Sequence, residues 1–300
     1  MSATPDELIR RHTMIGSAYS EAKTRTDLEN FALAPKQMEF YRDNGYLWPV
    51  RLFELDQIET IRERLEDIID DDFTHRDRLI GLNVEKGVTK DEQMIYFQNA
   101  WMVDEIMHDT LFNARMTVPL HQLLGVDKVR FFHDQVFYKP ARHGGVVAWH
   151  QDYSYWTRTV PQGHITCFVA LDDSTLENGC MQVIPGSQKW DILPRVPLTG
   201  GIEDMKAIKK VMSPEQLAAF EPVPLTLKAG EASFHHPVIL HGSYPNKSDR
   251  KRRGLVLNFM KADTRSDSDD PIMPDTPIIP KGEIIIGDAF PVVFDLARLI

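Results

Sequence analysis

The chain has 300 residues, 42% of them hydrophobic and 26% charged, which is typical of a folded globular protein and excludes wholesale disorder. Its 34 Lys and Arg against 44 Asp and Glu give a net charge of −10, and this acidic balance disfavours nucleic acid as the main partner. Two cysteines cannot frame a disulfide scaffold, and no apolar run reaches the ~18 residues of a membrane span, so we expect a cytoplasmic protein without a membrane partner that handles small molecules.

The first third of the chain has the patterning of a helical scaffold. Residues 1–34 are polar and weakly patterned, and they are predicted to form an N-terminal arm. A helix is expected over residues 35–44, because it begins with Pro and is followed by Gly45, and a short strand comes next. Apolar residues at helical spacing predict further helices over 55–69 and 103–124.

From residue 128 the pattern changes to short segments rich in Val, Ile and Phe. Asn178-Gly179 suits a tight hairpin, and Pro185-Gly186 suits a type II turn. A helical insertion at about 204–220 and a segment rich in Asp and Pro at 263–280 complete the chain. A series of short strands punctuated by turns predicts a sandwich or a jelly-roll barrel. The predicted strands are 128–138, 164–171, 180–184, 225–234 and 255–260.

The first candidate for chemistry is His150-Gln151-Asp152. On a strand, residues i and i+2 share a face, so His150 and Asp152 are expected to project together. An imidazole and a carboxylate at that separation can take neighbouring positions on one metal ion. A second histidine would complete a set of two His and one carboxylate, which holds non-haem iron and leaves three positions open.

Three residues compete for the place of the second histidine. His241 follows an apolar run and precedes a turn, 241 − 150 = 91 residues after His150. Because strand ends and loops host sites in barrels, His241 is favoured. His235 and His236 lie in the preceding strand-like run and stay as alternatives.

A basic run after His241 suggests an anion anchor. Iron oxygenases of this type use 2-oxoglutarate, whose far carboxylate needs a fixed cation, and the planar fork of arginine binds a carboxylate through two hydrogen bonds. If a strand begins in this run, Arg252 shares a face with Gly254 and Val256, and Arg253 takes the other face. Gly254 would leave room for a ligand. A solvated basic turn is the alternative interpretation.

Taken together, these residues resemble the phytanoyl-CoA dioxygenase family of Fe(II)- and 2-oxoglutarate-dependent oxygenases. Family members place the cosubstrate arginine eleven positions after the distal histidine, and 241 + 11 = 252 selects Arg252. The resemblance spans roughly residues 36–262. The matching pieces are His150-Gln151-Asp152, then Asn178-Gly179-Cys180 leading to Ile184-Pro185-Gly186-Ser187, then His241-Gly242-Ser243 with Asn246, Ser248 and Arg252.

The resemblance implies a mainly β fold with flanking helices around a double-stranded β-helix, that is, a cupin-like jelly roll. We expect it to form a single domain over residues 35–300, after the arm. The implied metal is Fe(II), held by His150, Asp152 and His241. The implied cosubstrates are O2 and 2-oxoglutarate, the latter anchored by Arg252, and ascorbate is expected to support activity.

The resemblance also implies weaker contacts. Gln135 matches a position that lines the 2-oxoglutarate pocket, and Ser243 can hydrogen-bond the far carboxylate. Phe168 matches a position that packs near the cosubstrate, although a plain core role is the alternative. Lys139 is expected to be structural, and a lid role for the lysines of the 204–220 insertion is less favoured than a solvated helix face.

The expected activity is hydroxylation of an aliphatic C–H in a small, largely apolar substrate, as a tailoring step in secondary metabolism. The carboxylate of Asp152 favours hydroxylation over halogenation. An acyl-CoA 2-hydroxylase of the phytanoyl-CoA type is the alternative enzyme. A non-catalytic cupin-like binder of a small molecule or a metal is the alternative of another class. The only partner expected is the substrate, and the protein is expected to be a monomer or a homodimer.

Overall fold

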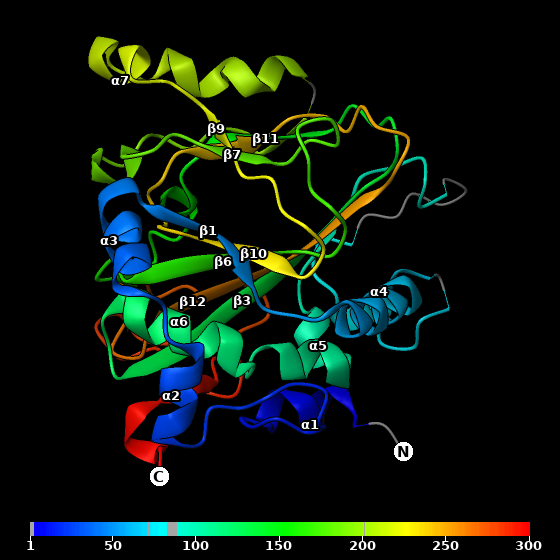
Figure 1. The fold of residues 1–300 in the computed structure, drawn as a ribbon, viewed down its shortest axis with the longest axis vertical. Helices are drawn as coiled ribbons and strands as arrows, with labels where there is room; N and C mark the ends of the chain where they lie inside the picture. The colour runs from blue at the N-terminus through cyan, green and yellow to red at the C-terminus, as the bar shows by residue number, and fades with distance from the viewer. Residues whose placement is uncertain (1–2, 71, 83–88, 201) are drawn as a thin grey trace.

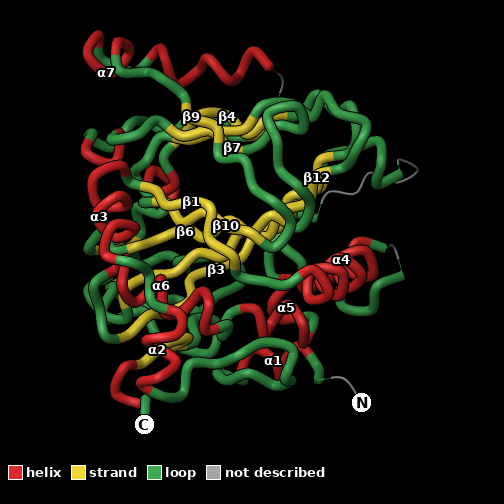
Figure 2. The backbone as a smooth tube through the Cα atoms, viewed as in Figure 1, coloured by secondary structure: helices red, strands yellow, loops and turns green. Residues whose placement is uncertain are grey.

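The computed structural model describes residues 3–70, 72–82, 89–200 and 202–300. Two antiparallel sheets lie one above the other, with helices on the outer side of each (Figures 1 and 2). The predicted fold class, mainly β with flanking helices around a double-stranded β-helix, is confirmed. In the described part of the chain, no helix combines the length and the apolar character needed to cross a membrane.

Within the described residues, the larger sheet has seven strands in the order β1-β10-β6-β12-β3-β14, and β2 also pairs with β3. They are β1 (Tyr46–Arg51), β2 (Ile95–Phe97), β3 (Lys128–Lys139), β6 (His164–Ala170), β10 (Glu231–His235), β12 (Arg252–Lys261) and β14 (Val292–Asp295).

The smaller sheet runs in the order β8-β4-β11-β7-β9, and a two-stranded ribbon pairs β5 with β13. These strands are β4 (Val146–His150), β5 (Thr159–Val160), β7 (Met181–Val183), β8 (Thr199–Gly200), β9 (Val223–Pro224), β11 (His241–Ser243) and β13 (Arg265–Ser266). Every pairing is antiparallel.

Alternation of side chains divides the larger sheet into a core face and a cavity face. On β3, Val136 and Tyr138 belong to the main hydrophobic core beneath the sheet. Gln135 and Phe137 point the other way and line a cavity between the two sheets. Strands β6 and β12 repeat this pattern, as the two-residue period of a strand requires. One face therefore supplies stability, and the other is available for chemistry.

The outer side of the larger sheet is covered by helices (Figure 1). The helices predicted over 35–44 and 55–69 are confirmed. The region predicted as helical over 103–124 is two helices. The first ends at Thr110, and Asn113 caps the second by accepting a hydrogen bond from Arg115 N at 3.1 Å. The helices are α1 (Pro5–Arg10), α2 (Arg25–Phe31), α3 (Pro35–Asn44), α4 (Leu55–Ile69), α5 (Glu105–Thr110) and α6 (Ala114–Leu124).

The predicted arm contains α1 and α2, which sequence patterning did not reveal. Each begins with a capping box, formed by Thr4 with Glu7 and by Thr24 with Asp27. Leu8 of α1 is buried. The division of the chain into an arm and one domain stays a prediction.

Beyond the smaller sheet lie η5 (Ile202–Lys210) and α7 (Pro214–Ala218), so the insertion is helical but largely 3-10 (Figure 1). Met205 and Ile208 bury their side chains with Trp149. The other 3-10 segments are η1 (Arg76–Arg78), η2 (Ala100–Met102), η3 (Asp152–Tyr155), η4 (Ser187–Lys189) and η6 (Leu296–Arg298).

One predicted turn is confirmed and the other is wrong. Gly186 has φ 81° and ψ −10°, and Ser187 N donates to Ile184 O at 3.2 Å, as a type II turn requires. Asn178-Gly179 does not form a hairpin, because β6 and β7 belong to different sheets. The Asn178 side chain instead stabilises the connection that crosses from β6 to β7. It accepts a hydrogen bond from Thr175 N and donates one to Asp173 O, both at 2.7 Å.

A substitution at Gly230, in the connection between β9 and β10, tests how closely this connection packs against the segment that contains Phe53. It has φ 85°, and a Cβ there would lie 2.3 Å from Phe53 O. We expect Gly230→Ala to lower the free energy of unfolding by about 2–4 kcal/mol, from left-handed strain plus a backbone clash. Gly282→Ala is the matched control, since Gly282 has φ 89° with no atom within 4 Å, and should cost about 1 kcal/mol. Urea unfolding measures both, and equal losses would contradict the packing argument.

Candidate active site

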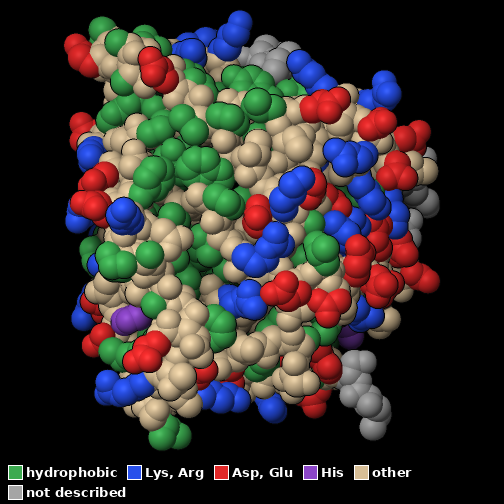
Figure 3. All heavy atoms as spheres, in the orientation of Figure 1, with side chains coloured by type: hydrophobic (Ala, Val, Ile, Leu, Met, Phe, Trp, Pro, Cys, Tyr) green, Lys and Arg blue, Asp and Glu red, His purple; other side chains and the backbone are tan. Residues whose placement is uncertain are grey.

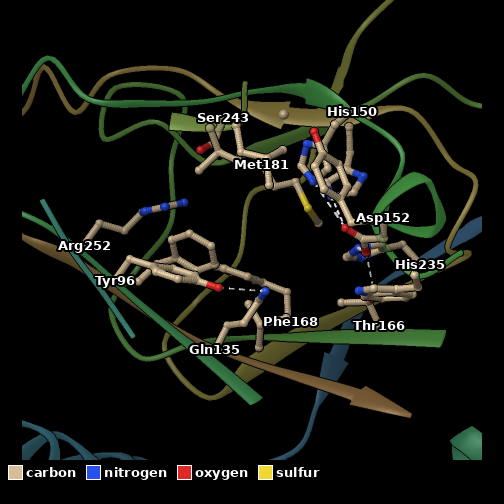
Figure 4. A pocket seen from close by; sticks show the side chains of 18 residues that line it. Tyr96, Gln135, His150, Asp152, Thr166, Phe168, Met181, His235, Ser243 and Arg252 are labelled. Atoms are coloured by element: carbon tan, nitrogen blue, oxygen red, sulfur yellow. Dashed lines mark hydrogen bonds and ion pairs between the residues drawn. The ribbon is translucent and has the colours of Figure 1, made fainter. Parts of the chain in front are cut away.

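A cavity of about 310 Å³ lies between the two sheets, which is in the size range of small-molecule sites. Its two ends are polar: Arg252 and Ser243 lie at one end, and His150, Asp152 and His235 at the other (Figure 4). The lining residues are Tyr96, Gln135, Phe137, Val147, His150, Asp152, Tyr155, Trp156, Thr166, Phe168, Met181, Leu198, His235, His241, Gly242, Ser243, Arg252 and Val256.

The end of the cavity that contains His150 and Asp152 is built by the pairing of β4 with β11, which sets His150 opposite His241. Their ring centroids are 4.2 Å apart. Asp152 Oδ1 lies 3.2 Å from His150 Nε2 and 3.5 Å from His241 Nε2. Asp152 is not on the strand, as the sequence argument assumed, because β4 ends at His150 and Asp152 opens the 3-10 turn η3. The turn still brings the carboxylate back to the imidazole.

Hydrogen bonds to the backbone orient both imidazoles. His150 Nδ1 lies 2.7 Å from Ala148 O, and His241 Nδ1 lies 3.0 Å from Ile239 O. A carbonyl only accepts, so each Nδ1 carries the hydrogen and each Nε2 keeps a free lone pair toward Asp152. Burial lowers the pKa of His241 to about 3, which keeps its ring neutral near pH 7.

The second oxygen of Asp152 is occupied by protein groups. Thr166 Oγ1 donates to Asp152 Oδ2 at 2.8 Å, and His235 Nε2 lies 3.3 Å from the same atom. Burial alone would raise the pKa of Asp152, but the charge that His241 carries when protonated in acid, with the contacts of His150 and His235, outweighs it and holds that pKa well below 3.8. Asp152 is therefore ionised near pH 7, with Oδ1 facing the two Nε2 atoms.

This donor set fits a divalent transition metal. Two imidazole nitrogens and one carboxylate oxygen lie within 4.8 Å of one another. Their backbone and side-chain partners hold the ligand atoms in place, as the surroundings of metal sites commonly do. Such a set suits non-haem iron and leaves coordination positions for other ligands.

The candidates for the second histidine are now distinguished by position. His241 belongs to the cluster, whereas His235 lies beside the other oxygen of Asp152, Oδ2, and outside the cluster. His236 points elsewhere, and its Nδ1 accepts from Val238 N at 3.2 Å. The contact made by His235 was not anticipated from the sequence.

At the opposite end, Arg252 is 2% exposed. Its Nη1 donates to Gly179 O at 2.9 Å, and Nε has no partner among the described residues. Burial lowers its pKa to about 10, so it stays a cation near pH 7. A buried guanidinium with a free donor beside a cavity is suited to an anionic ligand.

The register predicted for the basic run is found in the structure. Arg253 points away from the cavity and binds Asp172 and Glu66, each at 2.8 Å. One expectation about this strand is wrong: Gly254 does not leave room for a ligand. A Cβ there would lie 2.6 Å from the Phe168 ring, so the space is taken by that side chain.

The remaining predicted residues lie along the cavity. Phe168 lies beneath Arg252, with the guanidinium carbon 5.8 Å from the ring centroid. Gln135 Nε2 donates to Tyr96 OH at 3.2 Å (Figure 4). Ser243 Oγ accepts a hydrogen bond from Lys139 Nζ at 2.8 Å.

Sequence reasoning missed several lining residues, among them Thr166 and Tyr96. Thr166 precedes Phe168 by two positions on β6, so strand alternation would have placed both on one face. Tyr96 is placed by the pairing of β2 with β3, for which the sequence carries no local signal.

Comparison with known proteins identifies the family. The profile of the phytanoyl-CoA dioxygenase family matches residues 41–254. Human peroxisomal phytanoyl-CoA dioxygenase is 25% identical over 263 residues, covering 84% of this chain and 75% of that protein.

Two bacterial proteins are more similar over shorter stretches, which cover only about half of each. A probable alpha-ketoglutarate-dependent hypophosphite dioxygenase of Stutzerimonas stutzeri is 31% identical over 155 residues, covering 52% of this chain and 53% of that protein. The L-proline trans-4-hydroxylase of Streptomyces griseoviridis is 32% identical over 152 residues, covering 46% of this chain and 56% of that protein.

Solved structures share the fold. The non-heme alpha ketoglutarate dependent carbocyclase SnoK superposes with a TM-score of 0.67 at 19% identity, covering 92% of this chain and all of that one. EctD from S. alaskensis, solved with 2-oxoglutarate and 5-hydroxyectoine, superposes with a TM-score of 0.62 at 20% identity, covering 85% of this chain and 84% of that one. On the family match, this chain belongs to the phytanoyl-CoA dioxygenase family of Fe(II)- and 2-oxoglutarate-dependent oxygenases.

Proposed function

We propose that this enzyme hydroxylates an aliphatic C–H of a small, largely apolar molecule, using Fe(II), 2-oxoglutarate and O2. The observation that carries the proposal is one cavity with a His-Asp-His cluster at one end and a buried arginine at the other. The two ends suit the two different groups of 2-oxoglutarate, the keto acid and the far carboxylate.

At the metal end, His150, Asp152 and His241 would hold Fe(II). When bound, iron with 2-oxoglutarate and O2 supplies an oxidant able to attack an unactivated C–H. The protein residues orient and shield: Thr166 holds Asp152 Oδ2, so that Oδ1 faces the imidazoles. All three donors are largely enclosed by the two sheets, which limits access of water.

At the other end, Arg252 and Ser243 would bind the far carboxylate, since both offer donors to the cavity. Phe168 and Gln135 would form the wall along the cosubstrate between the two ends, because both line the cavity there (Figure 4).

The walls near the metal end support an apolar substrate. Tyr155, Trp156 and Leu198 line the cavity there. Among the described lining residues, Arg252 is the one Lys or Arg, and the cosubstrate would occupy it. A tailoring step in secondary metabolism fits such a pocket, and both free, buried cysteines suit a cytoplasmic location.

The acyl-CoA alternative has less support. The nucleotide of coenzyme A carries phosphates that need cations, and the cavity offers no second Lys or Arg in its described lining. On the face drawn in Figure 3, Lys and Arg are interspersed with Asp and Glu.

The reaction is tested by incubating the protein with Fe(II), ascorbate, 2-oxoglutarate and a panel of candidate substrates. Release of succinate from 2-oxoglutarate separates an oxygenase from a non-catalytic binder. Mass spectrometry then identifies the substrate by the gain of one oxygen atom. A product of unchanged composition, or one that carries chlorine when chloride is supplied, would contradict hydroxylation.

Removing any one metal donor should release the iron. His150→Ala, Asp152→Ala and His241→Ala are each expected to weaken Fe(II) binding by at least about 100-fold, because even outer-shell changes cost 10–100-fold. Anaerobic equilibrium dialysis followed by metal analysis measures this. His236→Ala is the control, because its ring points away from the cluster. Normal iron binding by His241→Ala would refute its assignment as a ligand.

Arg252→Leu should raise the Michaelis constant for 2-oxoglutarate. Loss of a buried, charge-assisted pair costs about 2–5 kcal/mol, or roughly 30- to several-thousand-fold in affinity. Arg253→Leu is the matched control on the other face of β12: it breaks the pairs with Asp172 and Glu66, so stability should fall while the Michaelis constant stays close to wild type. The reverse outcome would show that Arg253 is the anchor.

A further inference from the structure

Two basic side chains face each other across the ladder of the larger sheet. In the pairing of β12 with β3, Arg252 lies directly opposite Lys139. Their exposed fractions are 2% and 0%. Like charges at directly opposed positions of an antiparallel pair are destabilising, and burial increases the cost.

The protein itself does not neutralise this pair. Within the described part of the chain, no carboxylate lies at ion-pair distance from Lys139 or Arg252. The neighbouring Arg253, by contrast, has both Asp172 and Glu66. Burial and the charge of Arg252 hold the pKa of Lys139 well below 10.5, which reflects the same uncompensated charge. An anion bound in the cavity beside Arg252 would offset this repulsion.

The hydrogen bonds of Lys139 indicate how it acts. Lys139 does not line the cavity, and its Nζ donates to Ser243 Oγ at 2.8 Å and to Tyr244 O at 2.9 Å. Because Ser243 Oγ accepts from Lys139, the hydroxyl hydrogen of Ser243 is free to be donated elsewhere. Ser243 lines the cavity at the same end as Arg252 (Figure 4).

We propose that Lys139 is a positioning residue for the far carboxylate of 2-oxoglutarate: it holds Ser243 as a hydrogen-bond donor to that carboxylate and adds a second positive charge beside Arg252. This inference rests on the proposed function of the cavity. It replaces the purely structural role that the sequence suggested for Lys139.

The two roles predict opposite effects of Lys139→Met. If Lys139 only braced β3 against β11, its loss would lower stability. If it serves an anion, its loss removes an uncompensated buried charge, and replacing a buried charge by an apolar side chain is often neutral or stabilising. The melting temperature without 2-oxoglutarate should therefore stay the same or rise, while cosubstrate binding weakens.

The experiment titrates the Fe(II)-loaded protein with 2-oxoglutarate in the absence of O2, by calorimetry. We expect Lys139→Met to bind 2-oxoglutarate about 10- to 100-fold more weakly than wild type, as for loss of one hydrogen bond to a charged group. Affinity for 2-oxopentanoate, which has a methyl in place of the far carboxylate, should not change. Lys251→Met is the matched control, since Lys251 pairs with Glu66 away from the cavity.

A double-mutant cycle tests whether the effect passes through Ser243. In a Ser243→Ala background, Lys139→Met should weaken 2-oxoglutarate binding less than it does in the wild type. Wild-type affinity in Lys139→Met would overturn the proposal, and so would equal losses for 2-oxoglutarate and 2-oxopentanoate. If the wild type itself fails to bind 2-oxoglutarate, the proposed function falls instead.

A second variant covers the case in which Lys139→Met does not fold. Lys139→Gln keeps a donor for Ser243 without the charge, and it should lose less 2-oxoglutarate affinity than the Met variant. Failure of both variants to fold would assign Lys139 to the fold and overturn the proposal.

Discussion

The antiparallel pairing of β4 with β11 sets His150 opposite His241, and the whole metal end of the cavity depends on this register. A slip of one residue in either strand would turn that strand's histidine to the other side of the sheet. Close approach of the strands holds the register: a Cβ on Gly242 would lie 3.1 Å from Trp149 N and Val147 O. The type II turn adds a further tie, because Ser187 Oγ accepts from Leu240 N at 2.8 Å, just before His241.

Patterns of period two were the most reliable guide from sequence to site. They separated Arg252 from Arg253, because adjacent residues on a strand cannot share a face, and the ion pairs of Arg253 account for the other face. The same rule predicted that His150 and Asp152 project together, but the strand that it assumed does not reach Asp152, because β4 ends at His150. The two side chains still lie close together, because the 3-10 turn η3 also brings the carboxylate of Asp152 toward the imidazole of His150.

What the sequence could not predict depends on pairing between distant segments. His235 and His241 both lie beside the cavity, because β10 belongs to one sheet, β11 to the other, and the chain crosses between them; their rings are 4.6 Å apart. No local pattern in the sequence shows which of these two histidines joins His150 and Asp152 in the cluster. The Lys139–Arg252 pair is hidden for the same reason, since 252 − 139 = 113 residues separate its members. The hairpin expected at Gly179 failed because a positive φ also suits a crossing between sheets.

The two polar ends are built on strands, whereas part of the wall beside the metal end is not. Tyr155 is the last residue of η3, Trp156 follows it, and Leu198 comes from the segment before β8. These segments hold one another: Tyr155 OH donates to Val196 O, and Arg195 lies 5.3 Å from the Tyr155 ring centroid. Substitutions there can reshape the proposed substrate wall without moving the sheet register that places the proposed metal ligands and the proposed anion site. In the proposed function, the shared chemistry of the family and the choice of substrate would therefore depend on physically separate parts of this cavity.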